Sequence, residues 1–477
     1  MQRQNEPITE GLATVLPIET NEVFYNPAQV FNRDLSILAI SVFNRESQPG
    51  GFLAPKKPFL SPQPHVFEGL AASGLRSIRY VKELQFGAYS VTANDIESVA
   101  VERMLKNAAH NSISLNTTCA DAILHLHANK GVYRVIDLDP YGSCAPFLDS
   151  AMAAVEPNGL LCITSTDSGV LCGNQPDLSF TRYGGFALKQ NYQHEMGLRV
   201  MLHAVASAAA RHRRGIRVLA AVSIDFYFRV FVQVTDSGAA ALASMEETSI
   251  VFQCSQCEFH HVHAMGKLSG PSNRKPARFE LNSSVCSQCD SQLSIGGPIW
   301  SGPLYDAAFV DSCISTIEDE QSAFPGITAW AKVKALMFGL KSELINVPLF
   351  YTIPGLMQAV KVSPPKLRVM LHFLRALGFK AGGSHRTPNA IKTDAPASVV
   401  FDLVRLYVQS LGTTAKTTLP QILAKPITTV IPDELEIDFN IKVDDDRSVP
   451  IYLPNPAAFW GPKPRASNKR PLDHIDQ

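Results

Sequence analysis

Short apolar runs alternate with amphipathic runs over the first half of the chain. The apolar runs are rich in Val, Ile, Leu and Phe and are bounded by turn residues, a pattern that is typical of buried strands. They lie at residues 65–70, 88–95, 132–139, 159–167 and 216–224, with a further one within 112–121. Helical periodicity occupies the segments between them, most clearly at 99–111 and 194–212. Strands that alternate with helices predict a doubly wound α/β sheet.

The last apolar run of this half, residues 226–236, begins almost directly after the strand predicted at 216–224. A gap this short cannot hold a crossover helix, so the two strands are expected to pair antiparallel. A hairpin that ends an otherwise parallel sheet is a feature of class I methyltransferases. The pattern therefore predicts a class I, Rossmann-like sheet, whose ligands would bind where the strands open at their carboxyl ends.

The character of the chain changes twice along its length. Residues 1–245 hold the predicted sheet, residues 246–299 are rich in Cys and Ser, and residues 300–477 form a mixed region. The clearest helix of the last region lies within 363–379, where prolines start it and Gly378 closes it. We expect three units in this order: an α/β domain, a Cys-rich segment and a C-terminal α+β domain.

Composition and charge narrow the class of protein. With 477 residues, 45% apolar and 18% charged, the chain is too large for one compact core and too apolar to be disordered. Its 43 basic and 43 acidic residues cancel, so a nucleic-acid partner would have to be held by a local basic face. No window approaches the ~20 apolar residues of a membrane span, and no segment indicates an obligate protein partner.

The start of the chain and its cysteines bear on the compartment. The first residues have neither the apolar core of a signal peptide nor the Arg-rich pattern of a transit peptide. Nine cysteines, an odd number in so long a chain, indicate a reducing compartment rather than a disulfide framework. We therefore expect an intracellular protein, cytoplasmic in a prokaryote, with the nucleus an alternative in a eukaryote.

Acidic residues follow successive predicted strands. Glu68 ends the first strand, and a loop of small residues behind it opens a helix, so that the backbone can approach a nucleoside-like ligand closely. The loop lacks the GxGxxG fingerprint, which disfavours a nicotinamide cofactor. Asp95 ends the next strand, where an acid can accept both hydroxyls of a ribose, and Asp121 follows the third. Each acid alone could form a turn or a cap; together they predict a cofactor site.

The stretch "DLDPYGS", residues 137–143, ends a buried strand with an acid, a proline and an aromatic residue. An exocyclic amine of a base is a poor nucleophile because its lone pair is delocalised into the ring. The carboxylate of Asp139 and the backbone carbonyl of Pro140 could accept its two N–H groups as a methyl group arrives. Tyr141 could stack on a base taken out of its helix. The alternative is an Asp-Pro turn with a core tyrosine.

Many ordered motifs give the chain a family resemblance. They are "ITEG", "FYNPAQVFNRDLS", "EGLAASGLRSIRY", "NDIE", "DLDPYGS", "YGGFALKQNYQHEMGLRV", "SIDFYFRVFVQV", "GGPIWSGPLYD", "IKTDAP" and "LPNPAAFWGPK". In these the chain resembles the tRNA (guanine(26)-N2)-dimethyltransferase family nearly from end to end. The resemblance implies a class I fold, S-adenosyl-L-methionine as donor, and transfer of one or two methyl groups to N2 of a guanine at a junction of two tRNA arms.

The resemblance also implies roles for individual residues. By matching motifs, Arg33 and Arg76 would contact the donor, Asp95 its ribose, and Asp121 with the Ala122 backbone its adenine, while Asp139 would be the catalytic carboxylate. A second pair, Glu195 and Arg199, lies four residues apart on a predicted helix. It is either part of the active-site rim or a simple i,i+4 ion pair.

Four cysteines form a second constellation. Cys254 and Cys257 make one CxxC knuckle, and Cys286 and Cys289 make another, which together can present four thiolates to a structural zinc ion. Catalytic zinc is disfavoured because four thiolates leave no open position. The gap between the knuckles is long for a zinc ribbon, so the loop must fold back or extend. Three neighbouring histidines could replace a thiolate as zinc ligands: His260, His261 and His263. The alternative to a zinc site is that the four cysteines are free thiols. We expect the other five cysteines to be buried.

Basic runs are candidates for the RNA surface. They lie at residues 211–217, 361–368, 379–392 and 463–471, and their accumulation beyond the sheet favours a tRNA-binding C-terminal domain, although charge runs are often simply solvated. Two other functions remain open. A DNA amine methyltransferase would share the donor site, and a zinc-ribbon RNA-binding protein without catalysis would keep the knuckles and basic runs.

Overall fold

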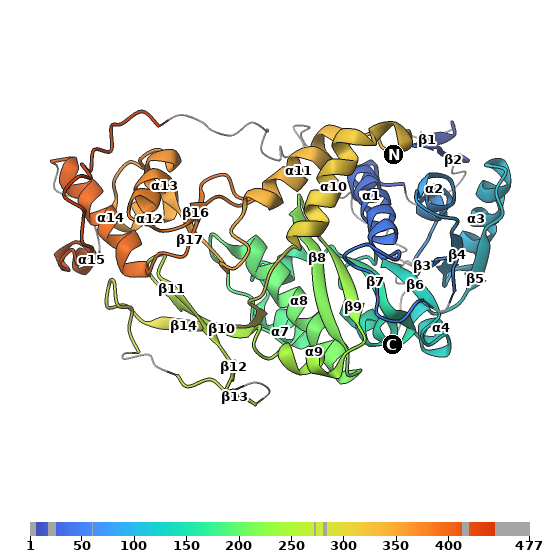
Figure 1. Ribbon diagram of the computed structural model, residues 1–477, viewed down its shortest axis with the longest axis horizontal. Helices are drawn as coiled ribbons and strands as arrows, with labels where there is room; N and C mark the ends of the chain where they lie inside the picture. Colours follow the sequence, from blue (N-terminus) through green and yellow to red (C-terminus); the bar gives the residue numbers. More distant parts are fainter. Residues whose placement is uncertain are drawn as a thin grey trace, which may run out of the picture.

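The computed structural model describes residues 6–17, 25–59, 61–270, 273–279, 284–412 and 419–443. The motif "LPNPAAFWGPK" and the basic run at 463–471 lie outside these residues. Within them, no helix has the length and apolarity needed to cross a membrane. Figure 1 shows the chain running from a large sheet with its helices to a smaller group of C-terminal helices, with a second small sheet beneath.

A seven-stranded sheet forms the larger part of the molecule, with strand order β5-β4-β3-β6-β7-β9-β8. Its strands are β3 (His65–Glu68), β4 (Ser90–Asp95), β5 (Asn116–Cys119), β6 (Tyr133–Leu138), β7 (Val155–Ser165), β8 (Gly215–Ile224) and β9 (Tyr227–Thr235). Only β9 runs antiparallel to its neighbours, β7 and β8. The predicted strands and the closing hairpin are thereby confirmed, and with them the class I α/β fold.

Helices cover both faces of this sheet and enclose two cores. One core holds side chains of α1 (Val30–Glu46), α2 (Leu75–Glu83) and α3 (Ser98–His110), and the other those of α4 (Ala122–Ala128), α5 (Leu148–Ala154) and α8 (Gln193–Arg211). Neighbouring strand residues enter opposite cores, as Val135 and Ile136 do. This alternation is the period of two that a sheet covered on both faces requires.

The chain returns to the first core after residue 300. Helices α10 (Ala307–Asp319) and α11 (Trp330–Ser342) bury their apolar faces against α1, through side chains such as Phe309 and Leu336. The boundary that the sequence predicts at residue 300 therefore does not coincide with a division of the hydrophobic core. The physical reason is that an amphipathic helix pattern shows that a face is buried but not which core buries it.

Two smaller sheets follow. Strands β10 (Thr248–Cys254), β11 (His260–Ala264) and β14 (Leu293–Trp300) form a sheet in the order β11-β10-β14, and β12 (Gly266–Leu268) and β13 (Arg274–Pro276) form a separate hairpin. The long segment between the knuckles thus both folds back, as β11, and extends, as the hairpin. The third sheet consists of β15 (Tyr351–Thr352), β16 (Ala381–Gly382) and β17 (Ala390–Thr393).

The C-terminal part has a core of its own. Its helices are α12 (Ile353–Val360), α13 (Leu367–Ala376), α14 (Ala397–Ser410) and α15 (Pro420–Ala424). They pack with the third sheet and with the four knuckle cysteines in one cluster. The predicted helix within 363–379 is α13, and Gly378 follows it with φ +90°, the left-handed conformation that ends helices. This α+β arrangement confirms the predicted class of the C-terminal part.

Short elements complete the fold. An N-terminal hairpin, β1 (Ile8–Glu10) with β2 (Ala13–Val15), packs beside α2 and α3. Three further helices connect the sheet strands: α6 (Ser168–Leu171), α7 (Pro176–Tyr183) and α9 (Gly238–Ala243).

Candidate active site

The carboxyl ends of four neighbouring strands bring the predicted acids to one edge of the large sheet. The strand order β5-β4-β3-β6 puts Asp121, Asp95, Glu68 and Asp139 along this edge in that sequence. The register agrees, because Glu68 pairs with Asp137 on one side and with Ala93 on the other. The direction of chain progression changes between β3 and β6, and this switch point is where open α/β sheets bind ligands.

The loop of residues 69–74 crosses the switch point and is held by backbone hydrogen bonds. The Gly69 amide donates to the carbonyl of Asp137 at 3.0 Å, and the Ala71 amide to that of Asn94 at 2.8 Å. A Cβ on Gly69 would lie 2.9 Å from Leu138 Cδ2, so a larger residue here would have to displace that side chain. Gly74, with φ +75°, then opens α2 in the left-handed conformation. The backbone is therefore fixed beside the acids.

The two acids expected to bind the nucleoside also shape the local backbone. Asp95 accepts the Ala72 amide at 2.9 Å and the Glu97 amide at 3.1 Å, which ties its loop to the loop 69–74. Asp121 caps α4 through Oδ1, which accepts the Ile123 and Leu124 amides. Its Oδ2 forms no hydrogen bond to any residue that the structure describes. Ala122 is the buried first residue of that helix.

The two acids of "DLD" have different surroundings. Asp137 is fully buried and accepts two hydrogen bonds from Arg229, at 2.9 and 2.7 Å, and one from Tyr80. Burial opposes its ionisation, but Arg229 and Arg76 hold the pKa of Asp137 below its usual value. Asp139, whose side chain is 18% exposed, pairs through Oδ2 with Arg76. Its Oδ1 bonds to no described residue, so Asp139 is the acid that a substrate can reach.

Arg76 is the centre of the acidic edge. Its guanidinium pairs with Asp139 and lies 3.5 Å from both Glu68 Oε1 and Asp137 Oδ2. Burial raises the pKa of Glu68 to about 8, although Arg76 and the Ser77 hydroxyl act in the opposite direction. The cation thus contacts both Asp139 and a second carboxyl, that of Glu68, which holds its proton more tightly than a free glutamate does.

Arg33 lies behind the edge. It comes from the buried helix α1 and donates to Glu10 of β1, with the Nε to Oε1 distance at 2.6 Å. Its guanidinium also lies 5.7 Å from the centre of the Tyr25 ring. Of the residues predicted to bind the donor, Arg33 is thus held by Glu10, whereas Arg76 is held by the acids of the sheet edge.

The residues after Asp139 form a turn that follows β6 and is hydrogen-bonded to Thr166, the residue after β7. Pro140 is buried, whereas the Tyr141 side chain is 66% exposed. Gly142, with φ +85°, donates to Thr166 Oγ1 at 2.8 Å and accepts from the Thr166 amide at 2.9 Å. Because Tyr141 is exposed, it is not the core residue of a simple Asp-Pro turn.

The four knuckle cysteines meet in the structure. Their Sγ atoms all lie within 4.8 Å of one another and are buried. The Sγ atoms of Cys254 and Cys289 are 3.4 Å apart, and the amide of Gln256 points at Cys254 Sγ at 3.4 Å. Among the described residues the group contains none of the neighbouring histidines, and His260 Nδ1 instead lies 3.1 Å from the Glu258 carbonyl.

Several other expectations change. Of the five remaining cysteines, Cys119 is exposed, because it ends the edge strand β5, and the other four are buried as expected. Glu195 and Arg199 form a buried i,i+4 ion pair at 2.8 Å rather than a solvent-facing rim. Most arginines of the basic run at 211–217 already form ion pairs or hydrogen bonds with other residues of the protein. Arg211 pairs with Asp149, Arg217 pairs with Asp306, and Arg214 donates to backbone carbonyls.

Sequence reasoning missed the charged cluster behind the site. Arg79 is fully buried and pairs with Glu10 at 2.8 Å, and with Asp34 and Glu83 at 2.7 Å each. The motif "ITEG" supplies Glu10, which joins Arg33 to Arg79. A charged residue inside an apolar run, such as Arg229 in "FYFRVFVQV", was the available signal for such buried pairs.

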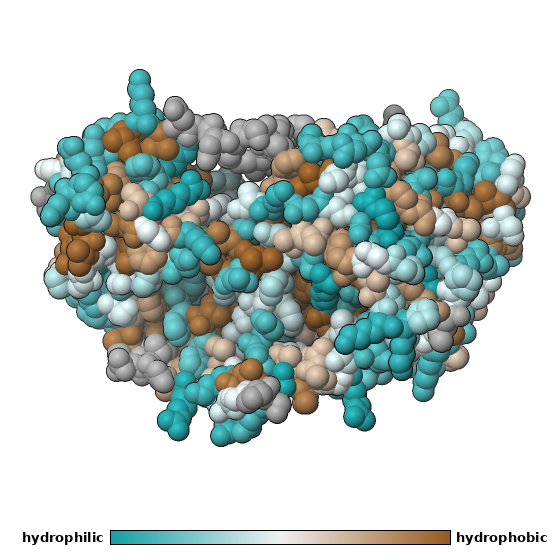
Figure 2. All heavy atoms as spheres, viewed as in Figure 1, coloured by the Kyte–Doolittle hydropathy of each residue, from teal (hydrophilic) through white to brown (hydrophobic). Residues whose placement is uncertain are grey.

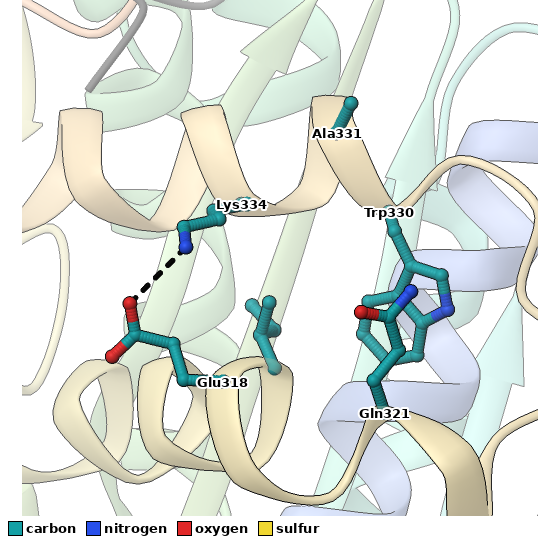
Figure 3. Close-up of a pocket in the computed structure, with 6 residues that line it drawn as sticks. Glu318, Gln321, Trp330, Ala331 and Lys334 are labelled. Atoms are coloured by element: carbon teal, nitrogen blue, oxygen red, sulfur yellow. Dashed lines mark ion pairs between the residues drawn. The ribbon is translucent and has the colours of Figure 1, made fainter.

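A surface pocket lies elsewhere on the molecule. Between α10 and α11, a cavity of about 410 Å³ is lined by residues that include Trp330, Gln321 and the ion pair of Lys334 with Glu318, whose atoms are 3.1 Å apart (Figure 3). None of the residues predicted for the site lines it. The chemistry of the strand ends, rather than this hollow, therefore marks the candidate active site.

Comparison with known proteins agrees with this geometry. The family model described as N2,N2-dimethylguanosine tRNA methyltransferase matches residues 4–405. The human tRNA (guanine(26)-N(2))-dimethyltransferase is 35% identical over 97% of this chain and 78% of its own, and that of Schizosaccharomyces pombe is 33% identical over 100% and 95%. The structure of Trm1 from Pyrococcus horikoshii with S-adenosyl-L-methionine is 25% identical with a TM-score of 0.68, over 83% of this chain and 98% of that chain. With its class I sheet and its row of strand-end acids, the chain belongs to the N2,N2-dimethylguanosine tRNA methyltransferase family.

Proposed function

We propose that this chain transfers methyl groups from S-adenosyl-L-methionine to the exocyclic N2 of guanine 26 in tRNA, giving N2-methyl- and N2,N2-dimethylguanosine. The observation that carries the proposal is the row of acids that ends at Asp139, on the edge of a class I sheet. Family membership over most of the chain supports the donor and the substrate.

The strand ends offer the groups that a nucleoside-containing donor needs. Asp95 is poised to accept ribose hydroxyls. Oδ2 of Asp121, which bonds to no described residue, is poised with the Ala122 backbone to bind the adenine. Glu68 and Arg76 lie between these residues and Asp139, and Arg76 could bind the carboxylate of the donor there. Arg33, which is paired with Glu10, would contact the donor from α1. When bound, the donor supplies an electrophilic methyl group, so no metal is required for transfer.

Asp139 and the two residues that follow it, Pro140 and Tyr141, would bind the guanine. Its Oδ1 has no partner among the described residues and can accept one N–H of the amine, while the Pro140 carbonyl accepts the other. The exposed ring of Tyr141 can stack on the base. Arg76 fixes the second oxygen of Asp139, which orients the carboxylate toward the amine. The lone pair of N2 would form the bond to the methyl carbon as the carbon–sulfur bond of the donor breaks, which releases the donor as a neutral thioether. The N–H proton that N2 gives up would pass to Asp139.

The first test identifies the product. Purified protein would be incubated with labelled S-adenosyl-L-methionine and undermodified tRNA, and the digested RNA analysed by mass spectrometry. We expect label in N2-methylguanosine and N2,N2-dimethylguanosine. Equal labelling of duplex DNA would favour the DNA amine methyltransferase, and failure to bind the donor at all would favour an RNA-binding protein without catalysis.

The second test concerns Asp139. Asp139→Ala should lower methyl transfer at least 100-fold, because a positioned acid or base contributes about 10²–10⁴-fold, while calorimetry should still detect donor binding. Asp95→Ala should instead weaken donor binding first. Asp177→Ala, which removes an exposed carboxylate of α7, is the control and should leave both unchanged. Near-normal turnover of Asp139→Ala would refute the role of this carboxylate.

We further propose that the four knuckle cysteines bind a structural zinc ion. Four thiolates around zinc at about 2.3 Å lie about 3.8 Å apart, close to the Sγ separations of 3.4, 3.6 and 3.7 Å. Amides that point at Cys254 and Cys286 support the thiolate charge. A zinc ion at this place would connect β10 to the C-terminal core, since Cys254 ends β10 and all four cysteines belong to the C-terminal cluster.

Metal analysis tests the zinc proposal. The purified wild type should contain about one zinc per chain, and the variant with Cys254→Ser and Cys257→Ser should lose it and unfold at a lower temperature. Cys119→Ser removes an exposed thiol outside the cluster and should keep the zinc. Unchanged metal content in the double variant would contradict the assignment.

A further inference from the structure

We propose that the outer face of the β11-β10-β14 sheet, together with the β12–β13 hairpin, is a docking surface for an unpaired stretch of the tRNA substrate. Aromatic rings of the sheet would stack on bases, and cations of the hairpin would pair with phosphates. This inference rests on the proposed function, because it takes tRNA as the substrate. The sequence indicates a tRNA-binding C-terminal domain, and this surface would be a further contact region outside that domain.

The sheet presents rings and apolar side chains on one face. Phe252 of β10 is opposite His261 of β11 and opposite Ile295 of β14, and directly opposed residues of an antiparallel sheet share a face. Ile295 is 62% exposed. The alternate residues Val251 and Gln253 point to the other face and are buried. The row of Ile295, Phe252 and His261 therefore faces outward.

A further ring completes this surface. The Phe279 side chain is 57% exposed and lies against two rings of the sheet, with centroids 4.9 Å from Phe252 and 5.3 Å from His263. His261 and His263 are themselves 6.0 Å apart. Clustered exposed rings of this kind mark an interaction site on a soluble protein. Each ring offers a flat surface on which a nucleotide base can stack without regard to its identity.

The hairpin beside the rings is basic. Residues 259–279 contain no Asp or Glu but include Lys267, Arg274, Lys275 and Arg278. Arg274 pairs with Glu246 at 2.7 Å, whereas the other three form no ion pair with any described residue. A sheet face of rings beside such a hairpin combines the two features by which proteins bind single-stranded RNA.

Two of these cations oppose each other directly. Lys267 of β12 is paired with Lys275 of β13 in the register of the hairpin, and both are exposed. Like charges directly opposite each other destabilise a strand pair. A phosphate bound between or beside them would relieve this repulsion. The charge pattern therefore favours a polyanion as the occupant over a protein segment.

The surface is anchored on both sides. At the base of the hairpin, the Met265 amide donates to the Thr248 carbonyl and the Ala277 amide to the Met265 carbonyl, each at 2.8 Å. At the other end of β10 lies the cysteine cluster, which begins at Cys254. Figure 1 shows the hairpin at the lower end of the small sheet, and Figure 2 shows hydrophilic side chains projecting from this end of the molecule. The hairpin is thus an exposed arm on a fixed base.

The charge test compares two double variants. Lys267→Ala with Lys275→Ala removes the opposed pair, and Lys106→Ala with Lys130→Ala removes the same charge from exposed sites of the large domain. Binding of unmodified tRNA would be followed by fluorescence anisotropy at several salt concentrations. We expect the first variant to bind tRNA about 10-fold more weakly, with the slope of log K against log salt smaller by roughly 1–2. Its affinity for S-adenosyl-L-methionine should be unchanged.

The ring test uses a conservative partner. Phe279→Ala should weaken tRNA binding by about 5- to 150-fold, the range found for losing one stacked base, and Phe279→Tyr should restore it. Zinc content and far-UV circular dichroism would verify the fold of each variant. If the wild type methylates tRNA but the hairpin and Phe279→Ala variants bind it like the control, the docking surface is refuted. If the wild type neither binds nor methylates tRNA, the proposed function itself fails.

Discussion

Glu68 is a buried carboxyl group whose ionisation the fold opposes. Its side chain is 5% exposed, and burial raises its pKa to about 8 despite Arg76. In an unfolded chain a glutamate ionises near pH 4.3, so the folded state binds this proton more tightly. The stability that Glu68 contributes is present below that pH and is lost as the pH rises through about 8. We expect the free energy of unfolding of the wild type, relative to Glu68→Gln, to fall by roughly 2–4 kcal/mol between pH 5 and pH 9.

Urea denaturation at pH 5, 7 and 9 would measure this difference. Glu97→Gln serves as the control, because it neutralises an exposed carboxyl close to the same sheet edge. Its stability should follow that of the wild type at each pH. Parallel pH profiles for the wild type and Glu68→Gln would show that the carboxyl of Glu68 is ionised throughout.

Single residues also show how far the sequence can predict the site. The strand-end pattern predicted that Glu68, Asp95, Asp121 and Asp139 would share one edge, because parallel strands align their carboxyl ends. The Asp-Pro-aromatic motif favoured Asp139 over Asp137, but it did not predict that Asp137 would be fully buried in an ion pair. The difference depends on Arg229, which lies 92 residues further along the chain, and local pattern carries no information on such a pairing.

Among the elements, β9 has a role beyond closing the sheet. Arg229 of β9 reaches Asp137 of β6 across β7, where it also donates to Thr164 at 2.9 Å, and it bonds Ser36 of α1 at 2.8 Å. Removing one partner of a buried pair leaves an uncompensated charge and costs about 3–5 kcal/mol. Asp137→Asn and Arg229→Met should each destabilise the protein by this amount. The double variant should lose clearly less than the sum of the two.

Chemical denaturation followed by circular dichroism would supply this double-mutant cycle. The exposed pair of Arg211 with Asp149 is the control, because both side chains are more than half exposed and its cycle should give about 0–1 kcal/mol. Additive losses at Asp137 and Arg229 would mean that the two charges are stabilised independently.

Strand pattern and helix pattern differ in what they predict about elements. Short apolar runs bounded by turn residues predicted each strand of the large sheet, and the short gap before β9 predicted its direction. Helices α10 and α11 were not assigned to the large domain, although Phe309 and Leu336 enter its first core. The order of strands follows from connection rules, but a helix beyond a long insertion can return to any open face.

At the scale of the whole molecule, a cluster of buried ion pairs around Lys392 connects the large domain to the C-terminal part. Lys392 of β17 is 1% exposed and bonds Glu195 of α8 at 2.9 Å and Glu343, at the end of α11, at 3.3 Å. Glu343 also pairs with His385 at 2.6 Å. Burial opposes the ionisation of Glu343, but Lys392 foremost lowers its pKa to about 2. The basic run at 379–392 thus ends in a structural cation and not in an RNA contact.

Lys392→Met should uncouple the two parts of the molecule. It leaves Glu195 and Glu343 buried without their shared cation, a loss of about 3–5 kcal/mol at the junction, while the apolar cores on either side remain intact. Calorimetry should therefore resolve a C-terminal transition at lower temperature that the wild type does not show. Lys380→Met makes the same change at an exposed lysine near the same sheet and should keep the wild-type profile. Donor binding should survive in both variants because the strand-end acids lie in the large domain. A single transition at the wild-type temperature in Lys392→Met would show that apolar contacts alone hold the two parts together.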